Sequence, residues 1–271
     1  MGVEERSDAR GVALIVYVPD PALAGLRAVL AGHDAVRAGR ARVDAPGPVP
    51  EVDWVEAWKQ GLTALLLGDR LILRPSFVEA PASATPRLEL VIDPGQAFGT
   101  GHHASTRLAL ECMLDPRSRW TTGQRVLDVG TGTGVLALAA LRLGAGRALG
   151  LDLDPLSPVD ARRWSRVNGL AERCDWLLGP IACVAGARFD WVLANLLRRE
   201  MEPIAKALAA AVAPGGHLVL SGLLAEERES VCRRFAPLGL SPVVMREERD
   251  ETGDHWLALV MGRPSGSGRP G

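Results

Sequence analysis

Residues 126–134 read Val-Leu-Asp-Val-Gly-Thr-Gly-Thr-Gly, and this stretch decides the fold. The apolar run 125–129 predicts a strand that the glycines end, and the run 134–143 predicts a helix. A second apolar strand, 148–151, leads into Asp152. Glycines let a backbone turn sharply and approach a ligand, and a helix N-terminus points N–H groups at it. A carboxylate at the tip of the second strand can accept the hydroxyls of a ribose, so the unit predicts a site for a nucleotide-like cofactor.

The spacing of the glycines selects the cofactor. Gly130, Gly132 and Gly134 form G-x-G-x-G, whereas a dinucleotide fingerprint requires G-x-G-x-x-G. Asp128 precedes the first glycine by two positions, and Asp-x-Gly-x-Gly-x-Gly resembles motif I of the class I S-adenosylmethionine-dependent methyltransferases. The alternative is a glycine turn of an ordinary doubly wound protein. Together with Asp152 the motif favours a methyltransferase, with S-adenosyl-L-methionine as cofactor and these five residues around it.

Beyond residue 100, strands alternate with helical stretches, which predicts a parallel sheet. Helices are expected over 105–114, 134–143, 158–168, 200–212 and 225–236, and strands over 125–129, 148–151, 175–178, 190–194 and 217–221. The last two strands, 241–247 and 256–261, flank the turn cluster 250–254 and predict an antiparallel hairpin. We therefore expect an α/β, doubly wound, mostly parallel seven-stranded Rossmann-like methyltransferase sheet.

The composition of the 271-residue chain is that of a globular protein, with 47% hydrophobic and 23% charged residues. The net charge of −1 shows no basic surplus, which argues against a direct nucleic-acid partner. No apolar run is long enough to span a membrane, and the charged start of the chain lacks a signal-peptide core. The four cysteines form no C-x-x-C pair. We expect a cytoplasmic protein, without metal or membrane contact and monomeric.

Residues 92–106 narrow the family: they read Ile-Asp-Pro-Gly-Gln-Ala-Phe-Gly-Thr-Gly-His-His-Ala-Ser-Thr. This resembles the pre-motif segment Asp/Glu-Pro-Gly-x-Ala-Phe-Gly-Thr-Gly-x-His-x-Thr-Thr of the methyltransferases that modify ribosomal protein L-eleven (L11), the PrmA family. Similar segments are Asp-Trp-x-x-x-Trp at 53–58, Ala-Asn-Leu-Leu at 194–197 and Pro-Gly-Gly…Ser-Gly at 214–222. The resemblance implies methylation of lysine side-chain and/or N-terminal amines, with L11 as the protein substrate.

The resemblance also implies roles for individual residues. Thr106 and Asn195 join Gly130 and Asp152 as cofactor contacts, and Asn195, at the tip of the fourth core strand, is the expected catalytic residue. Its amide oxygen and backbone carbonyl would face the transferred methyl group. A loop over the substrate is expected from Phe98, Gly99, Thr100, Gly101 and His103. The histidine pair at 102–103 lacks further ligands at zinc spacing, which disfavours a metal.

The residues after the fourth core strand also bear on the acceptor. Enzymes that methylate the planar nitrogens of amides or nucleic-acid bases have a motif resembling Asn/Asp-Pro-Pro-aromatic at this place. The segment 194–197 contains neither a proline nor an aromatic residue. A protein amine is the best remaining acceptor. Two alternatives stay open: a lysine methyltransferase acting on a different protein, and a non-catalytic S-adenosylmethionine-binding protein associated with the ribosome.

Four parts of the chain are expected. Residues 1–52, with a strand at 11–18, a helix at 22–31 and a short strand within 40–52, would form a small N-terminal α+β recognition domain, a reduced ferredoxin-like unit. Residues 53–87 would supply a helix, a strand at 70–74 and a linker. Residues 88–262 form the methyltransferase domain, and 263–271 a disordered tail rich in glycine, serine and proline.

Overall fold

The computed structural model describes residues 2–8, 11–17, 20–46, 62–81, 88–93 and 103–265. The chain divides into two compact units, Met1–Gly61 and Leu62–Gly271. The first unit contains strands β1 (Gly2–Asp8) and β2 (Gly11–Tyr17) and helices α1 (Asp20–Gly32) and α2 (Asp34–Arg37). The sequence predicted β2 and α1 but not β1, whose charged segment lacks an apolar pattern. β1 forms nonetheless because it pairs antiparallel with β2 along its whole length.

Some expectations for the N-terminal part are not met or lie outside the described residues. Residues 41–46 form no strand, although a short one was expected within 40–52. The helix expected from Asp53, with its two tryptophans, lies outside the described residues. The boundaries 1–52, 53–87, 88–262 and 263–271 therefore stay predictions.

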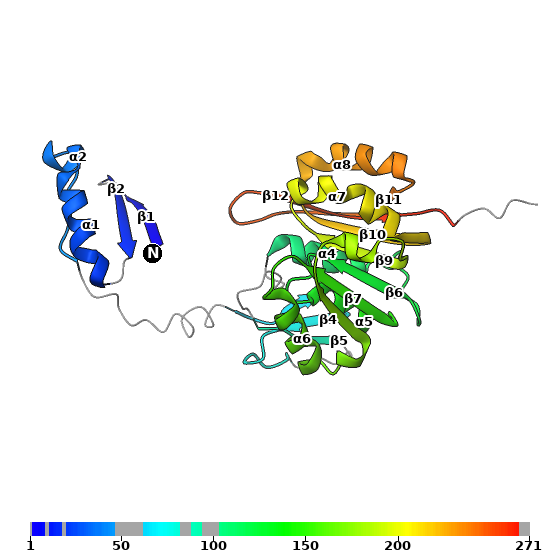
Figure 1. Ribbon diagram of the computed structural model, residues 1–271. Helices are drawn as coiled ribbons and strands as arrows, with labels where there is room; N and C mark the ends of the chain where they lie inside the picture. The colour runs from blue at the N-terminus through cyan, green and yellow to red at the C-terminus, as the bar shows by residue number, and fades with distance from the viewer. Residues whose placement is uncertain are drawn as a thin grey trace, which may run out of the picture. The chain divides into compact units, whose positions relative to one another are not determined.

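The second unit is built on a seven-stranded sheet, as the sequence predicted (Figure 1). Its strands are β6 (Arg125–Val129), β7 (Arg147–Asp152), β8 (Cys174–Leu178), β9 (Phe189–Asn195), β10 (Val212–Leu224), β11 (Ser241–Arg249) and β12 (His255–Gly262). Their order is β11-β12-β10-β9-β6-β7-β8, with parallel pairing from β10 to β8. β12 pairs antiparallel with both β10 and β11, which is the expected hairpin. Because the chain passes from β6 to β7 on one side and later returns to β9 on the other, the glycine loop after β6 lies at the switch point of the sheet.

Helices cover both faces of this sheet. α4 (Ala104–Leu114), α5 (Val135–Leu143) and α6 (Ser157–Val167) lie on one face, and α7 (Arg198–Ala211) and α8 (Arg228–Phe235) on the other (Figure 1). Single 3-10 turns are η1 (Ala171–Arg173), η2 (Ile181–Val184), η3 (Ala225–Glu227) and η4 (Ala236–Leu238). The helix expected over 225–236 is thus divided into η3 and α8.

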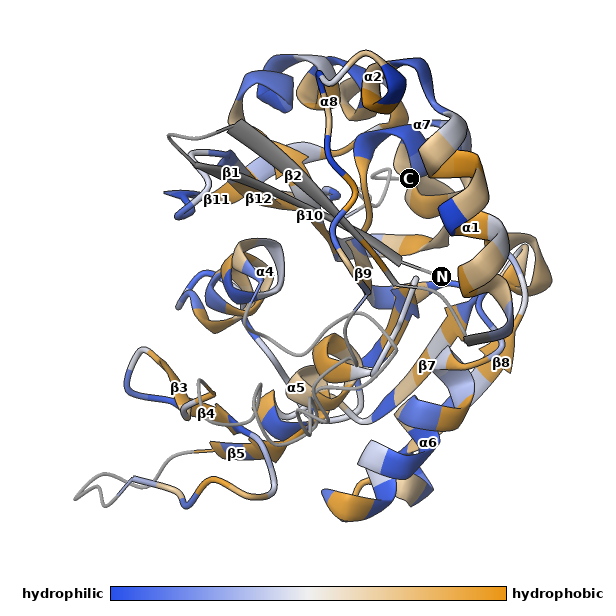
Figure 2. Cartoon of the chain, turned by 90° about the vertical axis from the view of Figure 1, so that its left-hand side faces the viewer, coloured by the Kyte–Doolittle hydropathy of each residue, from blue (hydrophilic) through white to orange (hydrophobic). Residues whose placement is uncertain are grey.

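Two apolar clusters, one on each face of the sheet, form the core. Val126 belongs to the cluster that includes α4 and α5, and its neighbour Leu127 to the cluster that includes α7 and α8. Strands buried on both faces read as continuous apolar runs, which explains why 125–129 could be predicted without an alternating pattern. Hydrophobic colour follows the central strands, whereas the outer helices have hydrophilic sides (Figure 2).

A three-stranded sheet precedes the large one in sequence. It contains β3 (Leu65–Leu67), β4 (Leu71–Arg74) and β5 (Leu88–Val91), with β3 antiparallel and β5 parallel to β4. The buried side chains of Leu71 and Leu90 belong to the same apolar cluster as α5. These strands therefore support the face of the sheet domain that α4 and α5 cover.

Candidate active site

The loop between β6 and α5 depends on its three glycines. Gly130, Gly132 and Gly134 have φ angles of 70°, 52° and 82°, the left-handed region that other residues rarely adopt. A Cβ atom at Gly130 would also lie 2.5 Å from Cδ2 of Leu196. The missing side chain at Gly130 therefore lets Leu196, just after β9, pack directly against the loop.

Asp128 supports the loop from beneath. Its side chain is only 1% exposed, and its Oδ2 accepts hydrogen bonds from Thr131 Oγ1 at 2.8 Å and Ala137 N at 3.2 Å. Burial, with a smaller contribution from the negative charge of Asp152, raises the pKa of Asp128 to about 7. Asp128 lies outside the lining of the cavity described below, so its predicted cofactor role would act through the shape of the loop.

Asp152 ends β7 with both carboxylate oxygens held in place. Oδ2 accepts from Gly132 N at 2.9 Å, and Oδ1 accepts from Asp154 N at 3.0 Å. An ionised carboxylate offers about four lone-pair positions, so each oxygen can still accept another hydrogen bond. Two vicinal hydroxyl groups, such as those of a ribose, match this capacity.

Asn195 is the last residue of β9, and a residue of α4 orients its side-chain amide. Its Nδ2 donates to Thr106 Oγ1 on α4 at 3.1 Å, and Thr106 itself is fully buried. The Oδ1 atom of Asn195 is buried and accepts no hydrogen bond from the described residues. Because an unsatisfied buried acceptor costs about 1–3 kcal/mol, this oxygen is arranged to receive a donor from a bound molecule.

Strand β10 leaves room for this arrangement. Gly222 has φ 79°, and a Cβ atom there would lie 2.7 Å from Leu196 O and 3.1 Å from Asn195 Oδ1. Beside it, Ser221 Oγ donates to Ser105 O at 2.7 Å, and Ser221 O accepts from Leu196 N at 3.0 Å. These bonds connect α4, β9 and β10 at the carboxyl edge of the sheet.

A cavity of about 350 Å³ joins these groups. It is lined by His103, Ser105, Gly130, Gly132, Asp152, Asp154, Ser157, Asn195, Leu196, Leu197, Glu200, Gly222 and Trp256. Of the predicted residues, Gly130, Gly132, Asp152, Asn195 and His103 meet here. Thr106, Asp128 and Gly134 lie behind this lining, and the predicted loop residues 98–101 fall outside the described residues.

The sequence did not reveal Glu200, Gly222 or Trp256 as site residues. Glu200 belongs to the first turn of α7, and Trp256 on β12 pairs with Leu224 of β10 and Glu248 of β11. Gly222 ends the Pro-Gly-Gly…Ser-Gly segment, which could have pointed to it. No local motif marks Glu200 or Trp256, because their place at the cavity depends on the order of the strands.

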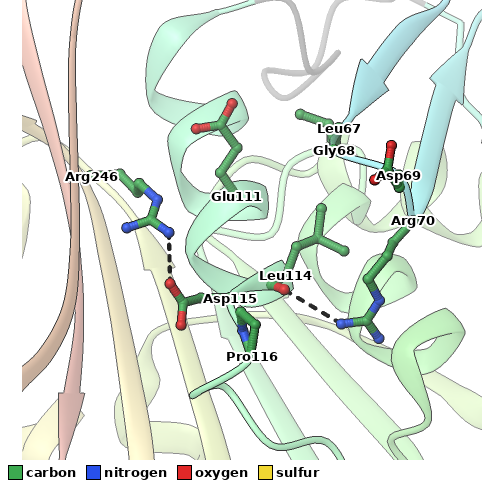
Figure 3. Close-up of a pocket in the computed structure, with 9 residues that line it drawn as sticks. All are labelled: Leu67, Gly68, Asp69, Arg70, Glu111, Leu114, Asp115, Pro116 and Arg246. Atoms are coloured by element: carbon green, nitrogen blue, oxygen red, sulfur yellow. Dashed lines mark hydrogen bonds and ion pairs between the residues drawn. The ribbon is translucent and has the colours of Figure 1, made fainter.

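A second cavity of about 400 Å³ lies between the β3–β4 turn, the end of α4 and β11 (Figure 3). Three of its charged groups are engaged with neighbours: Arg246 Nη2 pairs with Asp115 Oδ2 at 2.6 Å, and Arg70 Nη1 donates to Leu114 O at 3.4 Å. The cavity contains none of the glycine-loop residues. We therefore assign the candidate active site to the cavity at the glycine loop.

The residues of that cavity fit S-adenosylmethionine. The loop glycines Gly130 and Gly132, which line the cavity without side chains, the partly used acceptors of Asp152 and the buried oxygen of Asn195 suit an elongated ligand with a ribose at one end and a donor group at the other. The described residues contain no group of three or more side chains that could hold a metal ion. Among the helices described, none is long and apolar enough to cross a membrane.

Comparison with known proteins identifies the family. The family model "Ribosomal protein L11 methyltransferase (PrmA)" matches residues 9–263. The chain belongs to the PrmA family. A PrmA relative named ribosomal protein L11 methyltransferase, from Syntrophotalea carbinolica, is 40% identical over 237 residues, which cover 88% of this chain and 73% of the relative. The protein of that name from Cupriavidus metallidurans is 37% identical over 95% of this chain and 78% of its own.

A solved structure supports the fold within the PrmA family. The crystal structure of ribosomal protein L11 methylase from Lactobacillus delbrueckii subsp. bulgaricus matches with a TM-score of 0.62 and 24% identity, covering 74% of this chain and 99% of that one. At this identity the likeness establishes the fold alone. Membership of PrmA confirms the resemblance found in the sequence, the methyltransferase class of the enzyme and S-adenosylmethionine as its cofactor.

Proposed function

We propose that this enzyme transfers methyl groups from S-adenosylmethionine to lysine side-chain and/or N-terminal amines of ribosomal protein L11. The observation that carries the proposal is the buried Oδ1 of Asn195, which accepts no hydrogen bond from any described residue and whose amide is held in place by Thr106. This oxygen can only accept a hydrogen bond, so it suits a nucleophile that carries an N–H group. The names of the PrmA relatives supply the protein substrate.

The side chains of the cavity would position the amine rather than activate it strongly. S-adenosylmethionine, when bound, supplies a methyl group on a positively charged sulfonium. Asn195 Oδ1 accepts one N–H of the amine, which directs the nitrogen lone pair away from the amide and along the line of attack. Holding the amine in this orientation removes much of the entropic barrier to the displacement.

The amine must also lose its proton before it attacks. A free lysine titrates near ~10.4 and an α-amine near ~7.7–8.0. Desolvation by the apolar surfaces of Leu196 and Leu197 lowers both values, and the nearby carboxylates of Asp154 and Glu200 act in the opposite direction. We therefore propose that the walls of the site, and no dedicated strong base, set the fraction of neutral amine.

The cysteines argue against methylation of a pyrimidine carbon, a reaction that requires a cysteine nucleophile. Burial raises the pKa values of Cys112 and Cys174 to about 12, so both remain thiols at neutral pH. Cys183 and Cys232, the other two, do not line the cavity. A route through a cysteine nucleophile is thus unsupported, which leaves the protein amine as acceptor.

Further parts of the proposal concern the surroundings of the enzyme. A cytoplasmic location accords with a substrate that is a ribosomal protein, and a monomer without direct nucleic-acid contact remains our expectation. These points are independent of the chemistry of the cavity.

The test is methylation of purified, unmethylated L11 with isotopically labelled S-adenosylmethionine. We expect label on lysine or on the N-terminal amine, located by mass spectrometry. Asn195→Ala should lose most of the label, whereas Asp175→Asn, at an exposed ion pair with Arg147, should keep it. Label on a different protein of a ribosomal extract would favour the other lysine methyltransferase. Binding of S-adenosylhomocysteine with no label on any protein would favour the non-catalytic alternative.

A further inference from the structure

Trp256 is an aromatic wall of the candidate site that no motif of the sequence singles out. It lies near the start of β12 and lines the same cavity as Asn195. The indole is half-buried, and its Nε1 donates to Asp250 Oδ2 at 2.6 Å. Part of the ring packs against the apolar cluster that includes α4 and α5, and its polar edge is satisfied by its own hairpin. The part that lines the cavity therefore offers a ligand an aromatic surface.

The hairpin turn fixes Asp250 in turn. One of its oxygens, Oδ1, accepts from Thr252 N at 3.0 Å, Thr252 Oγ1 at 2.7 Å and Asp254 N at 3.0 Å. The hydrogen bonds from Thr252 and Trp256 lower the pKa of Asp250 to about 2. Asp250 is therefore a charged acceptor at neutral pH and holds the indole in one orientation.

His103 restricts the ring from a second direction. The centroids of His103 and Trp256 lie 4.7 Å apart at an interplanar angle of 74°, an edge-to-face contact. His103 is itself fixed as the N-cap of α4, where Nδ1 accepts from Ser105 N at 3.2 Å. A ring held on two sides loses little entropy when a ligand packs against it.

Methylation changes the charge and the hydrogen-bonding capacity of the acceptor amine. Each transfer forms one N–C bond and breaks one S–C bond, whose electron pair stays on sulfur, and it leaves the nitrogen positively charged. Solvent takes a proton from that nitrogen before another round. A trimethylated nitrogen has no N–H to donate to Asn195 and keeps its charge permanently. An aromatic face is the protein surface that recognises such quaternary ammonium groups.

We propose that Trp256 is an acceptor-binding residue whose indole face holds the ammonium form of the target amine, before deprotonation and after each methyl transfer. This inference rests on the proposed function, because it assumes that the acceptor is an amine. Asn195 then binds the neutral amine that attacks the methyl group, and Trp256 binds the ammonium form that enters and leaves the site. The carboxylates of Asp154 and Glu200, which also line the cavity, add attraction for the same charge.

The test compares two probes of the same shape and different charge. One is Nα-acetyl-trimethyl-lysine methylamide, and the other is its uncharged analogue, in which carbon replaces the quaternary nitrogen. Binding of each to the full chain saturated with S-adenosylhomocysteine is measured by NMR titration. We expect the charged probe to bind about 2- to 30-fold more tightly. Equal affinity of the two probes for the native protein would overturn the proposal.

Variants separate the ring from the carboxylates. Trp256→Phe should keep part of the preference for the charged probe. Trp256→Leu should keep only the part that the cavity carboxylates contribute. Glu200→Gln should reduce that carboxylate contribution. With L11 as substrate, Trp256→Leu should raise KM about 2- to 30-fold with little change in kcat. Unchanged affinity for S-adenosylhomocysteine reports that each variant is folded.

The outcomes keep the two proposals apart. A preference for the charged probe together with no methylation of L11 would contradict the proposed substrate and support Trp256 as an ammonium site. Methylation of L11 with no preference, or a Trp256→Leu variant that keeps the full preference, would overturn the role of Trp256 and leave the proposed function standing.

Discussion

Asn195 on β9 and Thr106 on α4 are joined by a hydrogen bond of 3.1 Å across 89 residues of sequence. In this bond the NH₂ group of Asn195 donates to Thr106. The Oδ1 atom of Asn195 receives no hydrogen bond from the described residues. One side chain thus positions another that is expected to touch the substrate. The first two predictions separate these two roles.

Asn195→Ala should lower the turnover rate more than it weakens donor binding. If the amide oxygen aligns the attacking amine, its contribution is largest in the transition state. Single-turnover methylation gives the rate, and calorimetry with S-adenosylhomocysteine gives the affinity. A variant that binds the donor poorly but reaches full turnover at saturation would make Asn195 a binding residue only.

Thr106→Val should reduce turnover by about 2- to 12-fold, since the lost hydrogen bond contributes about 0.5–1.5 kcal/mol and leaves the amide of Asn195 free to rotate. The substitution keeps the branched shape of the buried side chain, so thermal stability should fall little. Thr121→Val, at an exposed position, is the matched control. Unaltered turnover of Thr106→Val would show that the packing of β9 alone orients Asn195.

Asp152→Ala should weaken binding of S-adenosylhomocysteine by about tenfold to a few hundredfold, because hydrogen bonds to a charged acceptor contribute roughly 1.5–3 kcal/mol each. The exposed carboxylate of Asp175, which pairs with Arg147 outside the cavity, offers Asp175→Asn as control. Calorimetry measures both. A loss no larger than that of the control would remove Asp152 from the cofactor contacts.

Asp128→Asn should stabilise the protein above neutral pH. Burial raises the pKa of Asp128 from 3.8 to about 7, so between these values the folded chain binds a proton that the unfolded chain has released. Native stability therefore falls as pH rises through this window and levels off above pH about 7. Both donors to Asp128 use the same oxygen, Oδ2, which an asparagine amide oxygen can replace.

The melting temperature of Asp128→Asn relative to the native protein should accordingly be higher at pH 8 than at pH 5, by about 2–4 °C per kcal/mol. Other titrating groups contribute alike to both proteins and cancel in the difference. A difference that is the same at both pH values would show that Asp128 is not protonated in the folded state.

Gly150→Ala should destabilise the sheet domain by about 1–3 kcal/mol, through overpacking beneath the glycine loop. A Cβ atom there would lie 2.5 Å from the indole of Trp176 and 2.6 Å from Thr131 Oγ1. Gly25→Ala, in α1 with no atom within 4 Å of the added carbon, is the control. If calorimetric melting shows equal stabilities, the ring of Trp176 can move aside.

The sequence by itself determined the framework of the protein. The spacing of Gly130, Gly132 and Gly134 predicted the loop, and apolar runs predicted the seven strands, because backbone sterics and burial on both faces are properties of local sequence. The methyl donor could be inferred for the same reason, since a helix N-terminus and Asp152 are brought together by one strand–loop–helix–strand unit.

Only the tertiary structure decided what surrounds these residues. Asp128, expected at the cofactor, proved to lie under the loop, and β1 formed from a charged segment because its partner strand supplies the hydrogen bonds. The pairing of Asn195 with Thr106 and the place of Trp256 at the cavity depend on which strands lie side by side and how their ends align. Such contacts join residues far apart in the chain, and their energies depend on distances and angles that no local pattern contains.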